Sequence, residues 1–226
     1  MNTRTTKGQA GASGKAAQQE EAHRQARQRI LVRVAIGAAA VGVVLFLIFR
    51  STAGKRTNGG SNAYQTGQPA AGAAPAIDLA SSAGGRFDLS AQRGRTVLLY
   101  FQEGVGCEPC WTQIRDIERS WSRFQALGVD EMVSITGNPL SDIRTKVADE
   151  GLQTPVLADP DLAVSKSYHA NQYGMMGTSA DGHTFILVGP DGTIRWRGDY
   201  GGAPNYTMYV PINQLTANLQ AGMTRA

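Results

Sequence analysis

The two cysteines of this 226-residue chain lie three positions apart, in the segment Cys107-Glu108-Pro109-Cys110. They closely follow the apolar run VLLYF at residues 97–101. Two side chains at this spacing can meet only where the backbone turns tightly between them, as it does in the first turn of a helix. The pattern therefore predicts a buried strand, a short loop and a helix that begins at the cysteine pair.

This arrangement suits disulfide exchange. The free N–H groups and the positive dipole at a helix N-terminus stabilise a thiolate at Cys107. A thiolate is the attacking group in disulfide exchange, and Cys110 is placed to resolve the mixed disulfide that results. The redox-active disulfide would be the only redox group, and we expect no separate cofactor.

A metal site and an inert structural disulfide are the two other interpretations of the pair. A closed zinc site needs four ligands, and the chain has no second cysteine pair. Of its three histidines, His23 precedes a hydrophobic segment, which leaves His169 and His183 as candidates. The spacing favours the redox interpretation, and we expect no metal.

The charge of the chain is unevenly distributed. Residues 1–74 contain ten Lys or Arg and two Glu, a net charge of +8, whereas residues 75–226 contain twelve Lys or Arg and sixteen Asp or Glu, a net charge of −4. The excess of basic residues thus belongs to the N-terminal tail. Because the remainder is acidic, the charge does not indicate nucleic-acid binding.

Residues 30–49 (ILVRVAIGAAAVGVVLFLIF) contain one charge, Arg33, which can reach the lipid headgroups from near the start of the segment. A cleaved signal peptide is the alternative, but the preceding charged region is long for one, so we expect an uncleaved signal anchor. Basic residues are more numerous before the segment than after it, which predicts a cytoplasmic N-terminus and an extracytoplasmic C-terminal domain. That compartment permits disulfides.

Four regions follow along the chain. Residues 1–29 form a basic cytoplasmic tail, 30–49 the single-pass membrane anchor, 50–75 a flexible linker rich in small and polar residues, and 76–226 a redox domain. In this domain we expect an edge strand at 87–89, a buried strand at 96–101, a helix at 108–127, a strand at 130–136, a helix at 140–150 capped by Asn138 or Ser141, a short strand at 155–158, a helix at 159–168, a strand at 184–188, a turn at 189–192, a strand at 193–197 and a helix at 210–219. This order predicts an α/β fold with a mixed central sheet covered by helices.

The segments TVLLYF (96–101), GCEPCW (106–111), ADPD (158–161) and HTFILVGPDGTIRWRG (183–198) are similar to those of a known superfamily. The domain resembles the peroxiredoxin-like (AhpC/TSA) and membrane-anchored thiol–disulfide oxidoreductase branch of the thioredoxin superfamily. The resemblance covers residues 76–220 and implies a thioredoxin-like fold. It also implies that Cys107 is the more exposed nucleophile and Cys110 the resolving thiol.

The chain departs from the family pattern at several positions. In the peroxiredoxin pattern PxxxTxxC, the proline and threonine positions hold Tyr100 and Gly104 when counted from Cys107, and Glu103 and Cys107 when counted from Cys110. The arginine expected three residues before Phe185 is Gly182. The cis-proline that faces the cysteines in thioredoxins is also missing, since Gly182-His183 occupies its place.

Five supporting residues surround the pair in the sequence interpretation. Pro109 would stiffen the turn between the thiols. Glu103 and Glu108 could raise a thiol pKa or pass a proton to Cys110, with a solvated surface charge as the alternative, favoured for Glu108. Trp111 would shield the site or contact partners, or it would simply pack, and His183 could lie opposite the cysteines or at an ordinary strand edge.

The leading prediction is an extracytoplasmic, membrane-anchored thiol–disulfide oxidoreductase that acts on protein thiols. Its partners would be protein thiol or disulfide clients, an upstream electron donor or acceptor, and the lipid bilayer, with no nucleic acid. The first alternative is an antioxidant thiol peroxidase of the peroxiredoxin type, in which Cys107 is oxidised and Cys110 resolves it. The second is a copper-delivery protein that uses the thiolates, His183 and nearby methionines.

Overall fold

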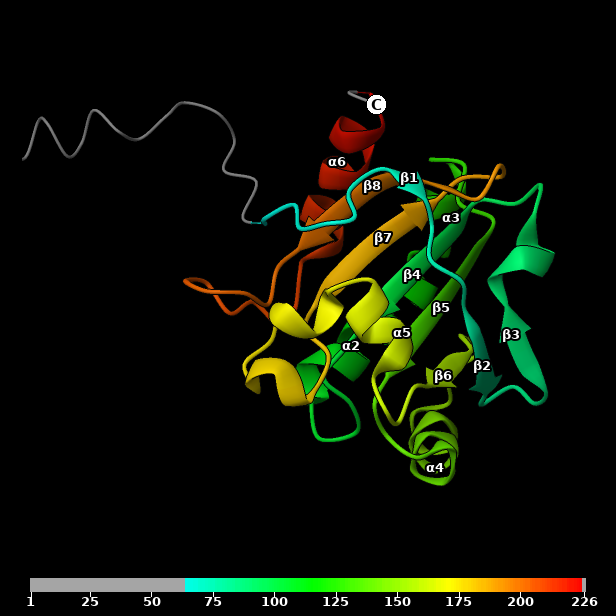
Figure 1. Ribbon diagram of the computed structural model, residues 1–226, viewed down its shortest axis with the longest axis vertical. Helices are drawn as coiled ribbons and strands as arrows, with labels where there is room; N and C mark the ends of the chain where they lie inside the picture. Colours follow the sequence, from blue (N-terminus) through cyan, green and yellow to red (C-terminus); the bar gives the residue numbers. More distant parts are fainter. Residues whose placement is uncertain (1–63, 225–226) are drawn as a thin grey trace, which may run out of the picture. The chain divides into compact units, whose positions relative to one another are not determined.

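The computed structural model describes residues 64–224, which form one mixed sheet with helices on both faces (Figure 1). The expected tail, membrane segment and first part of the linker lie outside the described residues. The sheet has the strand order β1-β8-β7-β4-β5-β6-β2-β3. Its strands are β1 (Gly72–Ala73), β2 (Asp78–Ser81), β3 (Arg86–Asp88), β4 (Val97–Phe101), β5 (Glu131–Thr136), β6 (Val156–Ala158), β7 (Thr184–Val188) and β8 (Thr193–Asp199).

The strand β4 is central, and its five residues are all buried. It pairs in parallel with β5 and antiparallel with β7, so the carboxyl end of β4 lies beside the amino end of β7. Phe101 is opposite Thr184 in this register. Residues that follow β4 are thereby placed next to residues that precede β7.

The two faces of the sheet are covered by different elements. The helices are α2 (Glu108–Arg119), α3 (Trp121–Gln125), α4 (Leu140–Glu150), α5 (Ala163–Ser167) and α6 (Ile212–Met223), with short 3₁₀ turns η1 (Leu89–Gln92), η2 (Ala170–Gln172) and η3 (Gly177–Ser179). Leu98 and Tyr100 of β4 pack with α2, α3 and α6, whereas Leu99 and Phe101 pack with the segments around α5 and η2. The alternation of a strand explains both layers, because successive side chains point to opposite faces.

The predicted strands and helices occur in the predicted order, but the structure adds two strands that were not predicted, β1 and β2, and the helices differ in their bounds. The expected helix 108–127 is interrupted at Ser120, whose backbone leaves the helical conformation and separates α2 from α3. The expected helix 159–168 is shorter, because Leu162 adopts a positive φ of 57° immediately before α5. The carboxylate of Asp159 accepts hydrogen bonds from the amides of Val164 and Ser165 instead.

The cap predicted for α4 is wrong. Pro139 occupies the cap position, and no side chain makes a capping hydrogen bond there. Asn138 is used differently, because its Oδ1 accepts a hydrogen bond of 2.9 Å from the amide of Val105 in the cysteine loop. A residue expected to start a helix thus supports the candidate site.

Residues 64–75, assigned to the linker by sequence, pack along β8. The amide of Gly67 donates to Asp199 Oδ2 at 2.6 Å, and Arg197 donates to the carbonyl of Gln68 at 3.1 Å. Arg197 and Asp199 form an ion pair whose side chains are fully buried, and such a pair requires additional hydrogen bonds to offset its loss of hydration. The segment supplies them, so the expected linker overlaps the folded unit at residues 64–75.

Among residues 64–224, no helix is both long enough and apolar enough to cross a membrane. The predicted anchor at 30–49 lies outside this part of the chain.

Candidate active site

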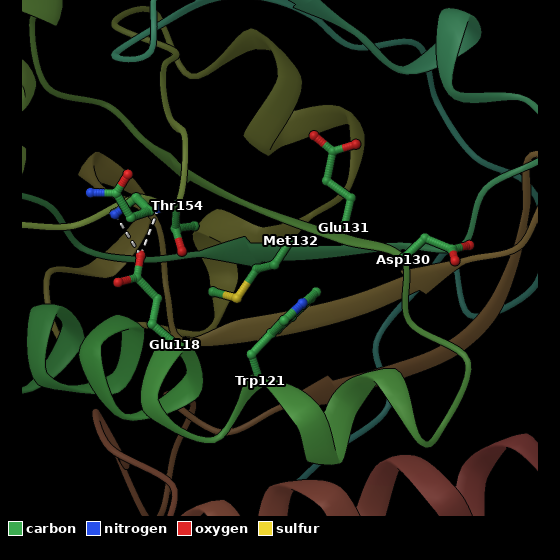
Figure 2. Close-up of a pocket in the computed structure, with 7 residues that line it drawn as sticks. Glu118, Trp121, Asp130, Glu131, Met132 and Thr154 are labelled. Carbon is green, nitrogen blue, oxygen red and sulfur yellow. Dashed lines mark hydrogen bonds between the residues drawn. The ribbon is translucent and has the colours of Figure 1, made fainter.

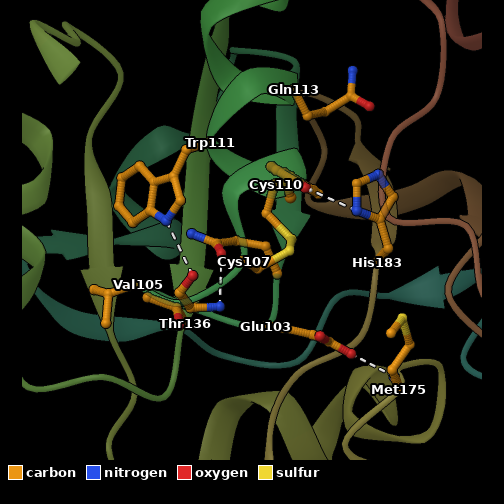
Figure 3. Close-up of a disulfide and its surroundings, with 12 residues drawn as sticks. Glu103, Val105, Cys107, Cys110, Trp111, Gln113, Thr136, Met175 and His183 are labelled. Atoms are coloured by element: carbon orange, nitrogen blue, oxygen red, sulfur yellow. Dashed lines mark hydrogen bonds between the residues drawn. A yellow bond between two sulfur atoms is a disulfide. The ribbon is translucent and has the colours of Figure 1, made fainter.

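The two cysteines form a disulfide at the amino end of α2, beside the carboxyl end of β4 (Figure 3). Their Cα atoms are 5.3 Å apart. Cys107 is the N-cap residue that immediately precedes α2, and Cys110 lies in the first turn. The strand, loop and helix predicted from the spacing are therefore confirmed.

The loop between β4 and α2 is held in place by buried hydrogen bonds. The amide of Gly104 donates to Gln102 Oε1 at 2.7 Å, and the amide of Cys107 donates to the carbonyl of Gly104 at 3.0 Å. Gly104 has a φ of 113°, and a Cβ atom at this position would overlap the side chain of Asn138. Glycine is thus required at a position where the peroxiredoxin pattern has threonine.

The two sulfur atoms have different environments. Cys107 is partly exposed and lines a surface pocket of 570 Å³, whereas Cys110 is fully buried. A disulfide partner can therefore approach Cys107 but not Cys110. The positive end of the α2 dipole favours a thiolate at Cys107 once the bond is reduced.

The pocket beside Cys107 is mostly apolar, and its lining includes three methionines and a tyrosine. Met175 and Met176 are 59% and 62% exposed, and Tyr206 is also exposed. The complete lining is Glu103, Gly106, Cys107, Pro109, Met175, Met176, Tyr206 and Met208. Methionine side chains adapt to varied apolar surfaces, so this rim suits contact with a partner of irregular shape.

Glu103 lies at this pocket, and its carboxylate accepts a hydrogen bond from the amide of Met175. The bond joins the end of β4 to the loop that carries the exposed methionines. Figure 3 shows Glu103 directed toward Met175 and away from Cys110. Its observed contact is thus structural, and it differs from the predicted proton relay.

Glu108 and Pro109 lie on the exposed side of the first turn of α2. Glu108 accepts hydrogen bonds from Arg115 at 2.9 Å and from Lys146 at 3.2 Å, and these two cations lower the pKa of its carboxyl group. Its carboxylate is therefore an exposed ion-pair partner. Pro109 lines the pocket and occupies a first-turn position, where a missing N–H costs no helical hydrogen bond.

Trp111 is fully buried, so it has no surface with which to contact a partner. Its Nε1 donates to the carbonyl of Gly104 at 3.0 Å, and the ammonium group of Lys146 lies 5.8 Å from its ring centroid. The Trp111 side chain thus helps to hold the cysteine loop in place. Of the two roles considered for Trp111, the structure favours packing.

His183 lies immediately before β7 and is fully buried. Figure 3 shows its ring on the inner side of the disulfide, near Cys110. Its Nδ1 is 2.9 Å from the hydroxyl of Tyr100, and its Nε2 has no hydrogen-bond partner. Burial lowers the pKa of the imidazole to about 3, so the ring is neutral.

The backbone of His183 is already engaged. Its amide donates to the carbonyl of Tyr173 at 2.9 Å, and its carbonyl accepts from the amide of Tyr200 at 2.8 Å. In thioredoxins the corresponding backbone faces the cysteine pair beside a cis-proline. Here the backbone amide and carbonyl of His183 are both engaged by other parts of the chain.

Asp181 is a buried acid that the sequence interpretation did not identify. Neither of its carboxylate oxygens has a hydrogen-bond partner, and burial raises its pKa to about 8 with a further contribution from Asp159. Ser165, the nearest hydroxyl, donates to Asp159 instead. The only sequence signal was its position next to Gly182 and His183, at the end of a glycine-rich loop.

A second pocket, of 460 Å³, lies at the opposite end of α2 (Figure 2). Its acidic side chains have structural partners. Glu118 Oε1 accepts from the amides of Gln153 and Thr154, and Glu131 pairs with Arg95. Since no cysteine or histidine lines this pocket, the disulfide remains the candidate active site.

Within the described part of the chain, no three His, Cys, Asp or Glu side chains are grouped so that they could hold a metal ion. His169 is exposed, and its Nδ1 contacts Gln172. The structure therefore does not bring the candidate zinc ligands His169 and His183 together with the cysteines as a four-ligand site.

Comparison with known proteins identifies similar sequences and structures. The model of the AhpC/TSA family matches residues 70–197. A Mycobacterium tuberculosis protein named "Putative peroxiredoxin Rv2521" is 32% identical over 126 residues, which cover 54% of this chain and 78% of that protein.

Two solved structures show the same fold at low sequence identity. The peroxidoxin BcpB from Mycobacterium tuberculosis has a TM-score of 0.55 and 15% identity, with 67% of this chain and 96% of that chain covered. AhpC from Enterococcus faecalis has a TM-score of 0.57 and 14% identity, with 69% and 92% covered. These matches confirm a thioredoxin-like peroxiredoxin fold.

Replacing Asp181 by Asn should change how stability depends on pH. The folded protein retains a proton on Asp181 up to about pH 8, whereas the unfolded chain releases it above about pH 4. The free energy of unfolding therefore falls between these values, by up to about 1.4 kcal/mol per pH unit from this group. An amide does not titrate, so Asp181→Asn removes this contribution.

Denaturant unfolding of both proteins between about pH 5 and pH 8 measures the effect. The stability advantage of Asp181→Asn should grow as the pH rises. The exposed Asp149→Asn variant on α4 is the matched control and should show no such trend. A difference between wild type and Asp181→Asn that stays constant with pH would contradict the assignment.

Proposed function

Because this chain belongs to the AhpC/TSA family and is a peroxiredoxin-like redox enzyme, we propose that its reaction is thiol–disulfide exchange through Cys107 and Cys110. The single observation that carries the proposal is the disulfide itself, with one sulfur at a pocket and the other buried. This asymmetry supports Cys107 as the nucleophile and Cys110 as the resolving thiol.

The reaction transfers two electrons between the enzyme dithiol and the client disulfide. In the reduced enzyme, the Cys107 thiolate attacks a client disulfide, forms a mixed disulfide and releases one client thiolate. Cys110 then attacks Cys107, which re-forms the 107–110 disulfide and releases the second client thiol. The client gains the two electrons that the dithiol loses, and an upstream donor restores the dithiol. The reverse sequence oxidises a client dithiol.

Protein thiols or disulfides are the proposed clients. The pocket beside Cys107 offers apolar contact through Met175, Met176 and Met208, which suits a peptide segment with apolar side chains. Glu103 is the one charged side chain in that lining. A client site with few charges would therefore fit better than a strongly acidic one.

A thiol peroxidase is the second candidate function, favoured by the relative named as a putative peroxiredoxin. In this reaction a peroxide would oxidise Cys107 to a sulfenic acid, and Cys110 would condense with it to the disulfide and release water. The pocket lining does not favour it, because no Arg, Lys or Thr lines the pocket to polarise a peroxide. The positions of the family threonine and arginine are held by Gly104 and Gly182.

We further propose that residues 30–49 anchor the enzyme in the cell membrane, with the N-terminus in the cytoplasm and the redox domain outside. The apolar length of the segment and the basic residues before it support this orientation. A disulfide between the two cysteines is compatible with an oxidising compartment.

The full-length protein should stay with the membrane fraction after alkaline carbonate washing, since an apolar helix resists this treatment. A variant without residues 1–49 should be released. The mass of the membrane-extracted protein should show that residues 30–49 are retained. Recovery of the full-length protein in the supernatant, or cleavage after the segment, would contradict the anchor.

Cys110→Ser should trap the client on Cys107. Incubation of the reduced full-length variant with glutathione disulfide should give a stable mixed disulfide at Cys107, because no thiol is left to displace it. Peptide mass mapping under non-reducing conditions locates the adduct. Cys107→Ser is the matched control and should form little adduct, since Cys110 is buried.

An adduct on Cys110 in the Cys107→Ser protein at the rate of the first variant would contradict the assigned roles. Hydrogen peroxide added to the reduced wild type provides the second arm. Slow oxidation is expected, whereas fast consumption that disappears in Cys107→Ser would assign the protein to the peroxidases.

A further inference from the structure

The buried position of Cys110 creates a requirement that the disulfide chemistry alone does not meet. Cys110 must be a thiolate when it attacks Cys107, yet burial in apolar surroundings raises the pKa of a thiol. Its proton therefore needs an acceptor that is also inside the protein. Solvent does not reach this sulfur, because its side chain is fully buried.

The hydroxyl of Tyr100 and the imidazole of His183 form a polar pair inside an otherwise apolar region. They are 2.9 Å apart, and both residues are fully buried. Phe185 stacks on Tyr100, and Tyr200 meets His183 edge to face. His183 Nε2 has no partner, which is unusual for a buried polar atom and leaves one hydrogen-bonding position open.

The pair lies beside the resolving cysteine. Tyr100 belongs to β4 and packs against α2, which carries Cys110, while His183 immediately precedes the neighbouring strand β7. Figure 3 shows the His183 ring among the side chains around the disulfide, on the Cys110 side, and its Nδ1 lies 2.9 Å from the Tyr100 hydroxyl. The reacting sulfur and the unfilled polar position thus share one buried region.

The charged side chains and the indole beside the disulfide already have hydrogen-bond partners. Glu103 holds the amide of Met175, Glu108 pairs with Arg115 and Lys146, and Trp111 donates to Gly104. Gln113 Oε1 accepts a hydrogen bond from the backbone amide of Val210 at 2.6 Å. The side-chain amide of Gln113 does not act as a base near neutral pH. The Tyr100–His183 pair is therefore the best-placed proton acceptor.

We propose that the Tyr100–His183 pair accepts the proton of Cys110 in the resolving step and returns it when the step reverses, an inference that rests on the proposed thiol–disulfide exchange. The neutral imidazole takes the proton from the Cys110 thiol, directly or through the Tyr100 hydroxyl. The thiolate attacks the sulfur of Cys107, the 107–110 bond forms, and the bond from Cys107 to the client breaks. The departing client thiolate then takes up this same proton from the imidazolium, which becomes neutral imidazole again.

The electrostatics of the region agree with a transient charge. Burial keeps His183 neutral at rest. The titratable side chains that face it within the described residues are Tyr100 on β4, Tyr200 after β8 and Cys110 on α2. Burial and the charge of Glu103 both raise the pKa of Tyr100, so its hydroxyl stays protonated and can relay a proton. Imidazolium forms only opposite a new thiolate, because an adjacent opposite charge stabilises it.

A single-turnover experiment separates the two cysteines. Reduced full-length protein is mixed with excess dithiobis(nitrobenzoate), which releases one coloured thiolate when Cys107 attacks it and a second when Cys110 resolves the mixed disulfide. Cys110→Ser identifies the second phase by removing it. Tyr100→Phe and His183→Asn are then compared with wild type across pH.

Both variants should keep the first phase and slow the second by about tenfold near neutral pH, because a thiol pKa one unit higher leaves about a tenth of the thiolate. The pH midpoint of the second phase should rise in parallel. Tyr209→Phe, whose hydroxyl contacts Asp116 away from the site, and His169→Asn, at an exposed position, are matched controls that should leave both phases unchanged.

An unchanged second phase and pH midpoint in Tyr100→Phe would overturn the inference, and this variant decides the question if His183→Asn does not fold. Loss of the first phase in wild type would instead reject the proposed function. A general loss of packing would slow both phases and would not move the pH midpoint of the second alone.

Discussion

The architecture of the site depends on the tight passage of the chain from β4 into α2. Gly104 turns with a positive φ, and two hydrogen bonds hold the loop: Asn138 Oδ1 accepts from the amide of Val105, and Trp111 Nε1 donates to the carbonyl of Gly104. Together they place the first turn of α2 over the carboxyl end of β4. One cysteine consequently faces the pocket while the other is buried against the sheet.

This placement connects the fold with the chemistry. The amino end of α2 favours a thiolate at Cys107, while the interior opposes one at Cys110. A dithiol with one exposed nucleophile and one buried resolving group separates client attack from disulfide closure. The methionine-bearing loop adds an apolar surface at the exposed sulfur, and Glu103 ties that loop to the end of β4.

Local patterns predicted much of this arrangement. The spacing of the cysteines, the apolar run of β4 and the turn at residues 189–192 are short-range signals, and the structure confirms the elements they predicted. Contacts between distant residues left no such signal. Gly67 meets Asp199 across 132 positions, so the order of residues 64–75 did not follow from their polar composition.

The role of Asn138 and the isolation of Asp181 were equally hidden from the sequence. Asn138 matched a helix cap locally, but a partner 33 residues away in the chain uses its side chain instead. The sequence places Asp181 in a loop, where an acidic side chain is usually exposed, and only the packing in the folded protein shows that it is buried. His183 was a candidate in the sequence as one of three histidines and through its match to a family position, but its burial with Tyr100 became visible only in the folded protein.

The most direct test of the account is the redox equilibrium of the Cys107–Cys110 pair. The full-length protein would be equilibrated in a graded series of dithiol and disulfide buffers, and its free thiols counted by mass after alkylation. A reversible couple predicts that both thiols appear together along one two-electron curve. Cysteines that remain oxidised in every buffer, or that react with peroxide faster than with disulfides, would contradict a thiol–disulfide oxidoreductase.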